Sequence, residues 1–236
     1  MDRPPAWSGA QFEGNADVLV HYALVHLRIS GLALGLGLAV AVPIAVATYR
    51  RRTAASIVLG VTSVAYTIPS LALLLIIGAA MGSLLSDWPL VFTLAIYTLV
   101  ILVRNLIEGL RAVPASSLDA AVAMGMTPTR RLLQVEFPLA LPAAIAGLRI
   151  AAVSTISLVT VGGIIGRGGL GFLIQEGYRK DNPRETIAAL VATVVLALAA
   201  DAVVVVTGRM LTPWERTSPR VRRRRTGLAG GGETAP

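Results

Sequence analysis

The chain has 236 residues, of which 55% are hydrophobic and only 14% charged, and its mean hydropathy is +0.71. Soluble domains carry charge on roughly a quarter of their residues, so this composition indicates a membrane protein. The formal net charge of +8 does not indicate nucleic-acid binding, because the basic residues lie in short segments beside apolar runs, as membrane topology favours. With no cysteine and only two histidines, the sequence excludes disulfides, thiolate or histidine metal clusters and a cysteine nucleophile.

Five apolar runs are long enough to cross a hydrocarbon core, which takes about 20 residues of helix. They predict an all-α, polytopic membrane protein. The second run is longer than one span needs and contains Pro69, so it is either one kinked helix or a broken pair, which leaves five or six segments. The predicted spans are Leu27–Tyr49, Ala54–Met81, Trp88–Leu110, Ala143–Ile165 and Thr186–Gly208.

These runs predict a transmembrane domain over 18–208, preceded by a segment 1–17 and followed by a basic tail 209–236. The opening residues lack the basic region and cleavage site of a signal peptide, so the first span is expected to be retained. With five spans, 14 of the 21 basic residues fall on one side of the membrane. The N-terminus is therefore predicted outside, and the connection 111–142 and the tail in the cytoplasm, where the tail is expected to be disordered and to bind anionic lipid.

The connection 111–142 first carries the signals of a short helix. Ser116 and Asp119 have the spacing of a capping box, which predicts that the helix begins at Ser116 with Asp119 in its first turn. Alanines and a methionine follow, which are good helix formers. Gly125 then supplies a natural C-terminal stop, because glycine readily adopts the left-handed conformation that ends many helices.

A second short helix is predicted directly after this stop. Thr127 followed by Pro128 is typical of a helix start, with the threonine as N-cap and the proline at the first helical position. Pro138 and Pro142 are expected to end that helix before the next span, because proline removes a hydrogen-bond donor and clashes with the preceding turn.

The first of these helices would present a small apolar surface formed by Ala120, Ala121, Met124 and Gly125. Such a surface suits insertion into a groove on another protein. The alternative is a loop that lies on the membrane surface. Two well-delimited helices in one connection favour docking over this alternative.

The same residues resemble a known family signature. Asp119-Ala120-Ala121, then Gly125, then Val135, Phe137 and Pro138 resemble the loop of binding-protein-dependent ABC permeases, which reads Glu-Ala-Ala, three residues, Gly, nine residues, Ile, one residue, Leu-Pro. The spacing is met throughout, with Asp in place of Glu, Val in place of Ile and Phe in place of Leu. Asp keeps the charge but shortens the reach by one methylene.

The resemblance implies a type I ABC importer subunit in the inner (plasma) membrane of a prokaryote, with this loop as the element that docks onto the ATPase. The implied partners are ABC ATPase subunits, a second permease copy or paralogue, and an extracytoplasmic substrate-binding protein. Asp119, Ala120, Ala121, Met124, Gly125 and Pro138 are the implied coupling residues.

Five further segments are similar to the permease subunits of osmoprotectant importers, which carry glycine betaine, choline, carnitine or related compounds. Methionine-type permeases share a similar Gly-Gly-Leu-Gly segment, so an importer of methionine or another amino acid is the alternative. The five segments are YTIPSLALL (66–74), MGMT (124–127), PLALP (138–142), AGLR (146–149) and IGRGGLG (165–171).

The glycines Gly166, Gly168, Gly169 and Gly171 formally match a dinucleotide-binding GxGxxG motif. That site needs a soluble strand and helix on either side, whereas this motif ends a membrane run, so dinucleotide binding is rejected. Glycines at a span end allow a tight turn. The resemblance implies that these four residues form part of an outer gate or contact the binding protein.

No P-loop motif is present and the only lysine is Lys180, so the chain is not expected to be an enzyme or to hold a cofactor. ATP and Mg²⁺ are expected on the partner ATPase. An ion-coupled secondary transporter is the rival from another class, but the sequence shows no clear internal repeat. Aromatic residues are only 5% of the chain, so selectivity for a quaternary ammonium is placed mainly in the binding protein.

Arg149 and Asp201 are ionisable residues inside the fourth and fifth predicted spans. Charges at membrane depth are costly and tend to pair. The two residues are therefore predicted to form an intramembrane ion pair with a structural or gating role, rather than each reaching the interface separately.

Overall fold

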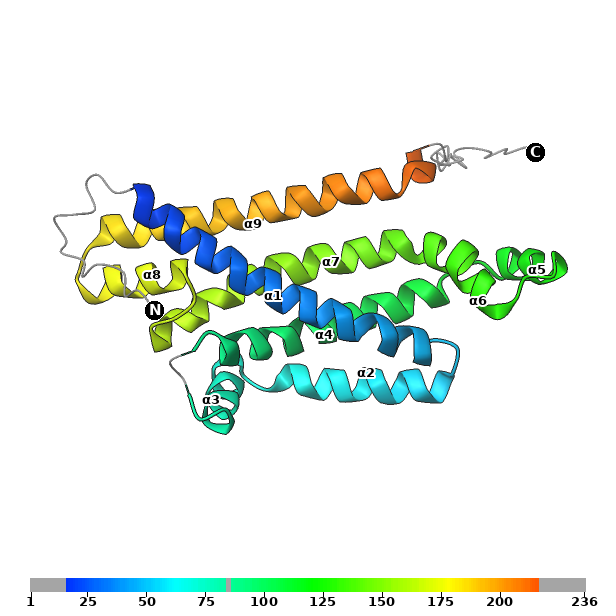
Figure 1. The fold of residues 1–236 in the computed structure, drawn as a ribbon, viewed down its shortest axis with the longest axis horizontal. Helices are drawn as coiled ribbons and strands as arrows, with labels where there is room; N and C mark the ends of the chain where they lie inside the picture. The colour runs from blue at the N-terminus through cyan, green and yellow to red at the C-terminus, as the bar shows by residue number, and fades with distance from the viewer. Residues whose placement is uncertain (1–15, 84–85, 217–236) are drawn as a thin grey trace, which may run out of the picture.

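The computed structural model describes residues 16–83 and 86–216, and every regular element within them is helical (Figure 1). The all-α fold class is therefore confirmed. The α-helices are α1 Ala16–Thr48, α2 Arg52–Thr67, α3 Ser70–Ala80, α4 Trp88–Arg111, α5 Ala115–Ala123, α6 Pro128–Arg131, α7 Phe137–Val159, α8 Leu170–Arg179 and α9 Pro183–Leu211. A π-helical turn covers Leu132–Glu136, and 3₁₀ turns cover Thr160–Ile165 and Pro213–Arg216.

Four stretches of the described chain are long and apolar enough to cross a membrane: Ala16–Thr48, Trp88–Arg111, Pro128–Ile165 and Pro183–Leu211. The run around Pro69 is a broken pair, in which α2 and α3 are bent by 94°. Ile68, which precedes the proline, has extended backbone with ψ of 125°, because proline disfavours helical geometry in the residue before it. The bundle therefore has five spans if the bent pair is counted as one.

Helix α1 begins well before the predicted start at Leu27, and residues 16 and 17 are already helical. The polar residues near the N-terminus of α1 are not typical of a membrane span, and the predicted span therefore excluded them. One of them, His26, is fully buried, and its Nε2 lies 2.9 Å from the carbonyl oxygen of Ile156 in α7. At the other end α9 continues to Leu211, and most of the predicted tail, from residue 217, lies outside the described residues.

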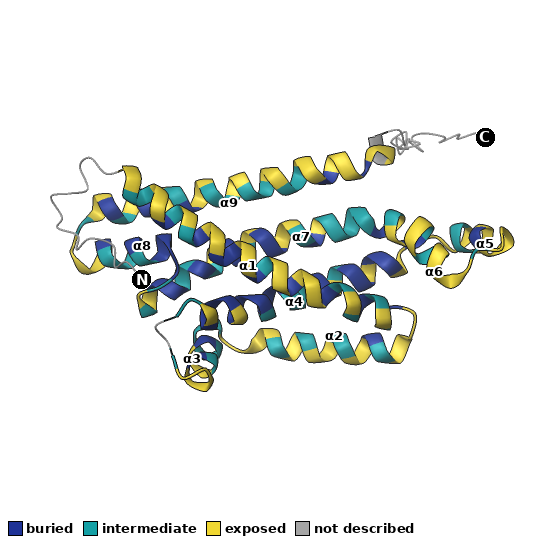
Figure 2. Cartoon of the chain, viewed as in Figure 1, coloured by how far each residue is buried: buried dark blue, intermediate teal, exposed yellow. Residues whose placement is uncertain are grey.

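The core of the bundle forms where α4 packs between α1 and α7, and buried residues gather along this crossing (Figure 2). The hydroxyls of Thr98 and Thr155, on α4 and α7, lie 2.9 Å apart and satisfy each other inside the bundle. Glycines allow the close approach. A Cβ on Gly37 would lie 2.6 Å from the Thr98 methyl carbon, and one on Gly147 would lie 2.4 Å from the Cβ of Asn105. Small residues at such crossings give membrane helices their packing contacts.

Helices α2 and α9 lie at the edge of the bundle and are exposed along most of their length (Figure 2). Ala55 is the buried residue of α2, and the buried residues of α9 are few. The exposed side chains of α9 are mostly valines and leucines, as expected of a surface that meets lipid or another membrane subunit.

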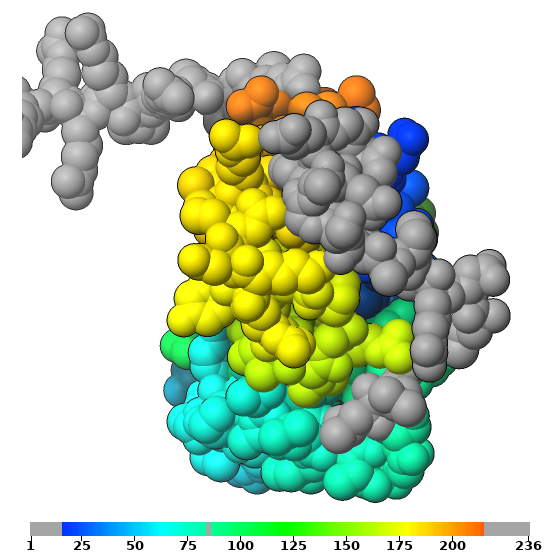
Figure 3. All heavy atoms as spheres, turned by 90° about the vertical axis from the view of Figure 1, so that its left-hand side faces the viewer, coloured from blue at the N-terminus to red at the C-terminus, as the bar shows by residue number. Residues whose placement is uncertain are grey.

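The long helices run between two ends of the molecule. The first, here called the α5 end, carries α5 and α6 and the C-terminus of α9 (Figure 1). The second, the α8 end, is formed by α8, the 3₁₀ turn Thr160–Ile165 and α3, which lie side by side when this end is viewed directly (Figure 3). The α5 end carries the predicted coupling loop, and the α8 end carries the glycine-rich segment 165–171.

Candidate functional site

At the α5 end, the first loop helix stops at Gly125 as predicted. Gly125 has φ of +72°, the left-handed conformation. Its N–H donates to the carbonyl of Val122 at 2.9 Å, and the N–H of Met126 donates to the carbonyl of Ala121 at 3.1 Å. These two bonds are the Schellman arrangement, which satisfies the last carbonyls of a helix and reverses the chain.

The start of α6 also follows the sequence signals. Thr127 is the N-cap, its side-chain oxygen accepts from the N–H of Arg130 at 3.4 Å, and Pro128 occupies the first helical turn. The start of α5 does not follow the sequence signals. Its N-cap is Pro114, whereas Ser116 already lies in the helix and Asp119 lies beyond the first turn. Pro114 has φ of −58° and extended ψ of 135°, so the helix begins directly after it and no serine cap is used.

The expected break at Pro138 and Pro142 was wrong. From Pro128 the chain runs through the π-helical turn into α7, with Pro138 in the first turn of α7 and Pro142 inside it. In the π turn the N–H of Phe137 donates to the carbonyl of Leu132, five residues earlier. This wider turn just before Pro138 relieves the clash that a proline makes with a regular preceding turn. The second loop helix is therefore continuous with the membrane span.

The outer surface of α5 is formed by exposed residues that include Asp119, Ala120, Met124 and Gly125. Met124 is 67% exposed and Val122 is 55% exposed. Ala121 is fully buried, so it does not contribute to an exposed surface as predicted. It is turned inward because α5 packs against α6 and the π turn.

A buried carboxylate holds this loop to the end of α1. Glu136, in the π turn, is 2% exposed. One of its oxygens accepts from the hydroxyl of Tyr49 at 2.5 Å. The other accepts from Nη2 of Arg50 at 2.8 Å and from Nε of Arg131 at 2.9 Å. We call Tyr49, Arg50, Arg131 and Glu136 the anchor cluster, because it joins the α1–α2 connection to the loop.

Protonation of Tyr49 keeps the anchor cluster intact at neutral pH. Burial, together with the hydrogen bond to the Glu136 carboxylate, raises the pKa of Tyr49 to about 12. The phenol therefore remains a hydrogen-bond donor throughout the physiological range. Arg111, at the end of α4, adds a further link, because its Nε donates to the backbone carbonyl of Tyr49 at 2.8 Å.

Sequence reasoning missed the anchor cluster. Glu136 was visible as a lone carboxylate in an apolar stretch, five residues after Arg131. Its other two partners, Tyr49 and Arg50, lie 87 and 86 residues away in the chain. That separation leaves no local pattern for the sequence to show.

The glycine-rich turn at the α8 end is a packing site. Gly166, Gly168 and Gly169 have φ of +72°, +91° and +56°. A Cβ on Gly168, Gly169 or Gly171 would lie between 2.2 and 2.6 Å from a backbone oxygen, which at Gly169 belongs to Tyr22 of α1. These residues let α8 pack closely against α1 and the 3₁₀ turn. A part in a gate or in binding-protein contact stays a prediction.

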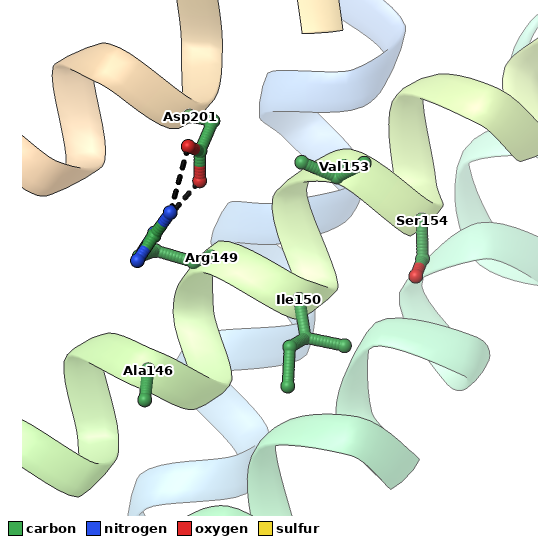
Figure 4. Close-up of a pocket in the computed structure, with 6 residues that line it drawn as sticks. All are labelled: Ala146, Arg149, Ile150, Val153, Ser154 and Asp201. Carbon is green, nitrogen blue, oxygen red and sulfur yellow. Dashed lines mark hydrogen bonds and ion pairs between the residues drawn. The ribbon is translucent and has the colours of Figure 1, made fainter. Parts of the chain in front are cut away.

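The structure brings Arg149 and Asp201 together across α7 and α9 (Figure 4). Nε and Nη2 of Arg149 donate to the two carboxylate oxygens of Asp201 at 2.7 and 2.8 Å. The side chains are 47% and 27% exposed in the single chain. Because charges at membrane depth avoid lipid, the open side of this pair is expected to meet protein or water.

The helical bundle, with its two-helix loop at one end, defines a polytopic membrane protein. Residues 33–217 match the family described as the binding-protein-dependent transport system inner membrane component. The chain belongs to this family. It is a multi-pass inner-membrane protein and a transporter permease subunit.

The chain is similar to several named osmoprotectant permeases. The choline transport system permease protein OpuBB of Bacillus subtilis is 34% identical over 199 residues, covering 84% of this chain and 91% of the relative. The osmoprotectant import permease protein OsmW of Salmonella typhimurium is 33% identical over 190 residues, covering 79% of this chain and 88% of the relative. The resemblance to osmoprotectant ABC permeases is therefore confirmed.

A solved structure shares the fold. The inward-facing MetNI methionine ABC transporter matches with a TM-score of 0.74 at 22% identity, covering 85% of this chain and 99% of the matched one. At this identity the match establishes the architecture of an ABC importer permease and nothing about the substrate.

We expect Glu136→Gln to weaken the anchor cluster, because Arg50 and Arg131 would lose their shared carboxylate. Removing one partner of a buried ion pair costs about 3 kcal/mol, or roughly 6–12 °C in melting temperature for a chain of this size. Thermal unfolding of the purified subunit in detergent measures the loss. Arg130→Gln is the matched control, since exposed Arg130 donates to Gln134 in the adjoining π turn and should change little. Equal melting temperatures for the two variants would contradict a stabilising role for Glu136.

We expect Arg149→Ala and Asp201→Ala each to reduce the yield of folded protein, because either change leaves the other charge without its partner in the membrane. The swap Arg149→Asp with Asp201→Arg should recover part of the yield lost by the single charge reversals. Size-exclusion profiles of the detergent-solubilised variants provide the measurement. A swap no better than the sum of the single reversals would show that the two residues do not stabilise one another.

Proposed function

We propose that this chain is the membrane subunit of an ATP-driven importer for a quaternary-amine osmoprotectant such as glycine betaine, choline or carnitine. The observation that carries the proposal is the similarity to named choline and osmoprotectant permeases over most of both chains. The alternative of a methionine or other amino-acid permease is supported by a shared fold at 22% identity and by the similar Gly-Gly-Leu-Gly segment.

The α5 end is the proposed docking site for the ATPase. Asp119, Ala120, Met124 and Gly125 present an exposed, largely apolar surface on a short helix, which suits insertion into a groove of the partner. The sequence has no P-loop, so ATP and Mg²⁺ belong to that partner. The distribution of arginines supports placing the α5 end in the cytoplasm and the α8 end outside.

Two other partners complete the proposed complex. A second permease copy or paralogue covers part of the exposed helical surface, and an extracytoplasmic binding protein delivers substrate at the α8 end, near Gly166. ATP binding and hydrolysis move the docked α5, and the continuous stretch from α6 into α7 carries this movement into the membrane. The bundle then opens alternately to either side.

Uptake by the complete complex in proteoliposomes tests the function. With ATP inside and the binding protein outside, we expect accumulation of radiolabelled glycine betaine or choline that requires ATP and persists without an ion gradient. Unlabelled carnitine should compete and methionine should not. Competition by methionine alone would support the amino-acid alternative, and uptake driven by an ion gradient without ATP would support a secondary transporter.

We expect Gly125→Val to weaken ATPase binding and transport while the subunit still inserts. A Cβ at Gly125 meets no atom within 4 Å, so the change acts through the positive φ alone. A non-glycine residue in this conformation costs roughly 1–2 kcal/mol and a β-branched one resists it most, so the turn between the loop helices should distort. Pull-down of the ATPase and uptake are the measurements.

Gly82→Val is the matched control for this change. Gly82 also has positive φ, +67°, and open space around its Cβ position, but it follows α3, far from the α5 end. The control should therefore carry a similar backbone strain and keep ATPase binding. Loss of binding in both variants would point to general misfolding, and normal binding in Gly125→Val would remove the proposed role of the turn.

A further inference from the structure

A groove with both polar and apolar side chains in its lining lies between α2 and α4, within the part of the bundle expected to cross the membrane. It encloses about 260 Å³, close to the roughly 300 Å³ at which small-molecule pockets begin. Its lining includes Thr62, Ser63 and Tyr66 from α2 and Arg104 and Asn105 from α4.

The charged residue of this lining is unsuited to lipid. Arg104 lies seven residues before the end of α4 at Arg111, or roughly 10 Å along the helix axis, and its side chain is 65% exposed in the single chain. A charged side chain at that depth faces protein or a water-filled space. Tyr66, on the facing helix, is also exposed, at 48%. The groove therefore opens onto water or another subunit in the assembled transporter, as a translocation pathway does.

One part of the groove suits a quaternary ammonium group. Such a group cannot donate hydrogen bonds, so proteins bind it with aromatic ring faces and partial negative charge. Tyr66 provides a ring at the C-terminal end of α2, where the helix breaks at Ile68 and the helix dipole places partial negative charge. The ring of Tyr66 is held in position by an edge contact with the ring of Tyr97, and the two ring centroids lie 5.5 Å apart. Tyr97 is itself fixed, because its hydroxyl donates to the carbonyl of Ile68.

The other part of the groove suits a carboxylate. Arg104 donates from Nε to Glu108 at 3.0 Å, but this is an exposed pair four residues apart on one helix. Such pairs contribute little, typically less than 1 kcal/mol, so the guanidinium can exchange this partner for another carboxylate. Asn105 is neutral and donates its amide to the carbonyl of Ile101 in its own helix, and Arg104 is the cationic residue of the lining.

We propose that the groove between α2 and α4 is a transit site for zwitterionic trimethylammonium compounds, with Tyr66 against the ammonium group and Arg104 binding the carboxylate. The assignment rests on the proposed osmoprotectant function and places part of the selectivity in the permease itself. It differs from the expectation, based on the low aromatic content, that selectivity lies mainly in the binding protein. One tyrosine beside a helix C-terminus is sufficient for a transit site that must also release its substrate.

Two substrates that differ in the carboxylate test this assignment. Glycine betaine carries both groups, whereas choline carries the ammonium and a hydroxyl. In proteoliposomes containing the complete complex, Arg104→Gln should lower the initial uptake rate of glycine betaine about tenfold, the usual value of one charge-assisted hydrogen bond, and leave choline uptake within about twofold. Tyr66→Leu should lower uptake of both substrates several-fold, and Tyr66→Phe should retain it, because the ring rather than the hydroxyl makes the contact.

Two controls separate binding from structure. Glu108→Gln removes the partner of Arg104 without touching the proposed site, so it should keep glycine betaine uptake; a loss equal to that of Arg104→Gln would show that the ion pair itself matters and would overturn the assignment. Phe92→Leu replaces an exposed aromatic residue of α4 that lies outside the groove, and it should leave the uptake rates of both substrates unchanged.

The outcomes distinguish this inference from the proposed function. If the unmodified complex moves neither substrate, the osmoprotectant function is wrong. If it moves both, and Arg104→Gln changes the two rates equally or not at all, the function holds and the transit site is wrong. A selective loss of glycine betaine uptake in Arg104→Gln, with both substrates affected in Tyr66→Leu, supports the site.

Discussion

The loop at the α5 end depends on one buried carboxylate. Glu136 accepts hydrogen bonds from Tyr49, Arg50 and Arg131, so it draws together the end of α1, the start of α2 and the second loop helix. Apart from this contact, the loop is held by its continuity with α4 and α7 and by the packing of Leu118 and Leu132 against the core. A short helix transmits force only if its base is fixed, and a buried, hydrogen-bonded ion cluster provides a more rigid base than exposed pairs can.

The sequence predicted those parts of the molecule that local chemistry decides. Hydropathy located the spans, and the turn between the loop helices followed from Gly125, Thr127 and Pro128, whose backbone preferences act over a few residues. The start of α5 was misplaced because Pro114 competes with Ser116 for the same role. Both residues are compatible with a helix start and they lie within one turn of each other, so the sequence alone does not show which of them begins the helix.

The other errors arose where contacts between residues far apart in the sequence determine the local structure. The π turn before Pro138 lets the chain continue as a helix, and the buried Ala121 faces inward because α5 packs against that turn. Neither follows from proline or alanine preferences alone. The partners of Glu136 and the pairing of α2 with α4 around Tyr66 involve separations of many residues, so they become visible only once the helices are placed.

Helix α2 connects the two regions to which function is assigned. It begins next to Arg50 of the anchor cluster and ends at the break beside Tyr66, a path of 16 residues or about 24 Å. Ala55 is its buried residue, so α2 has few packing contacts to lose when it shifts as a rigid rod. Its base is tied to the loop through Glu136, so α2 joins the loop to the groove by a second connection, beside the continuous stretch from α6 into α7. The position of the anchor cluster at one end of a loosely packed helix, with the groove at the other, is an arrangement that would let the proposed ATPase-driven movement reach the substrate contacts along α2 as well as along α7.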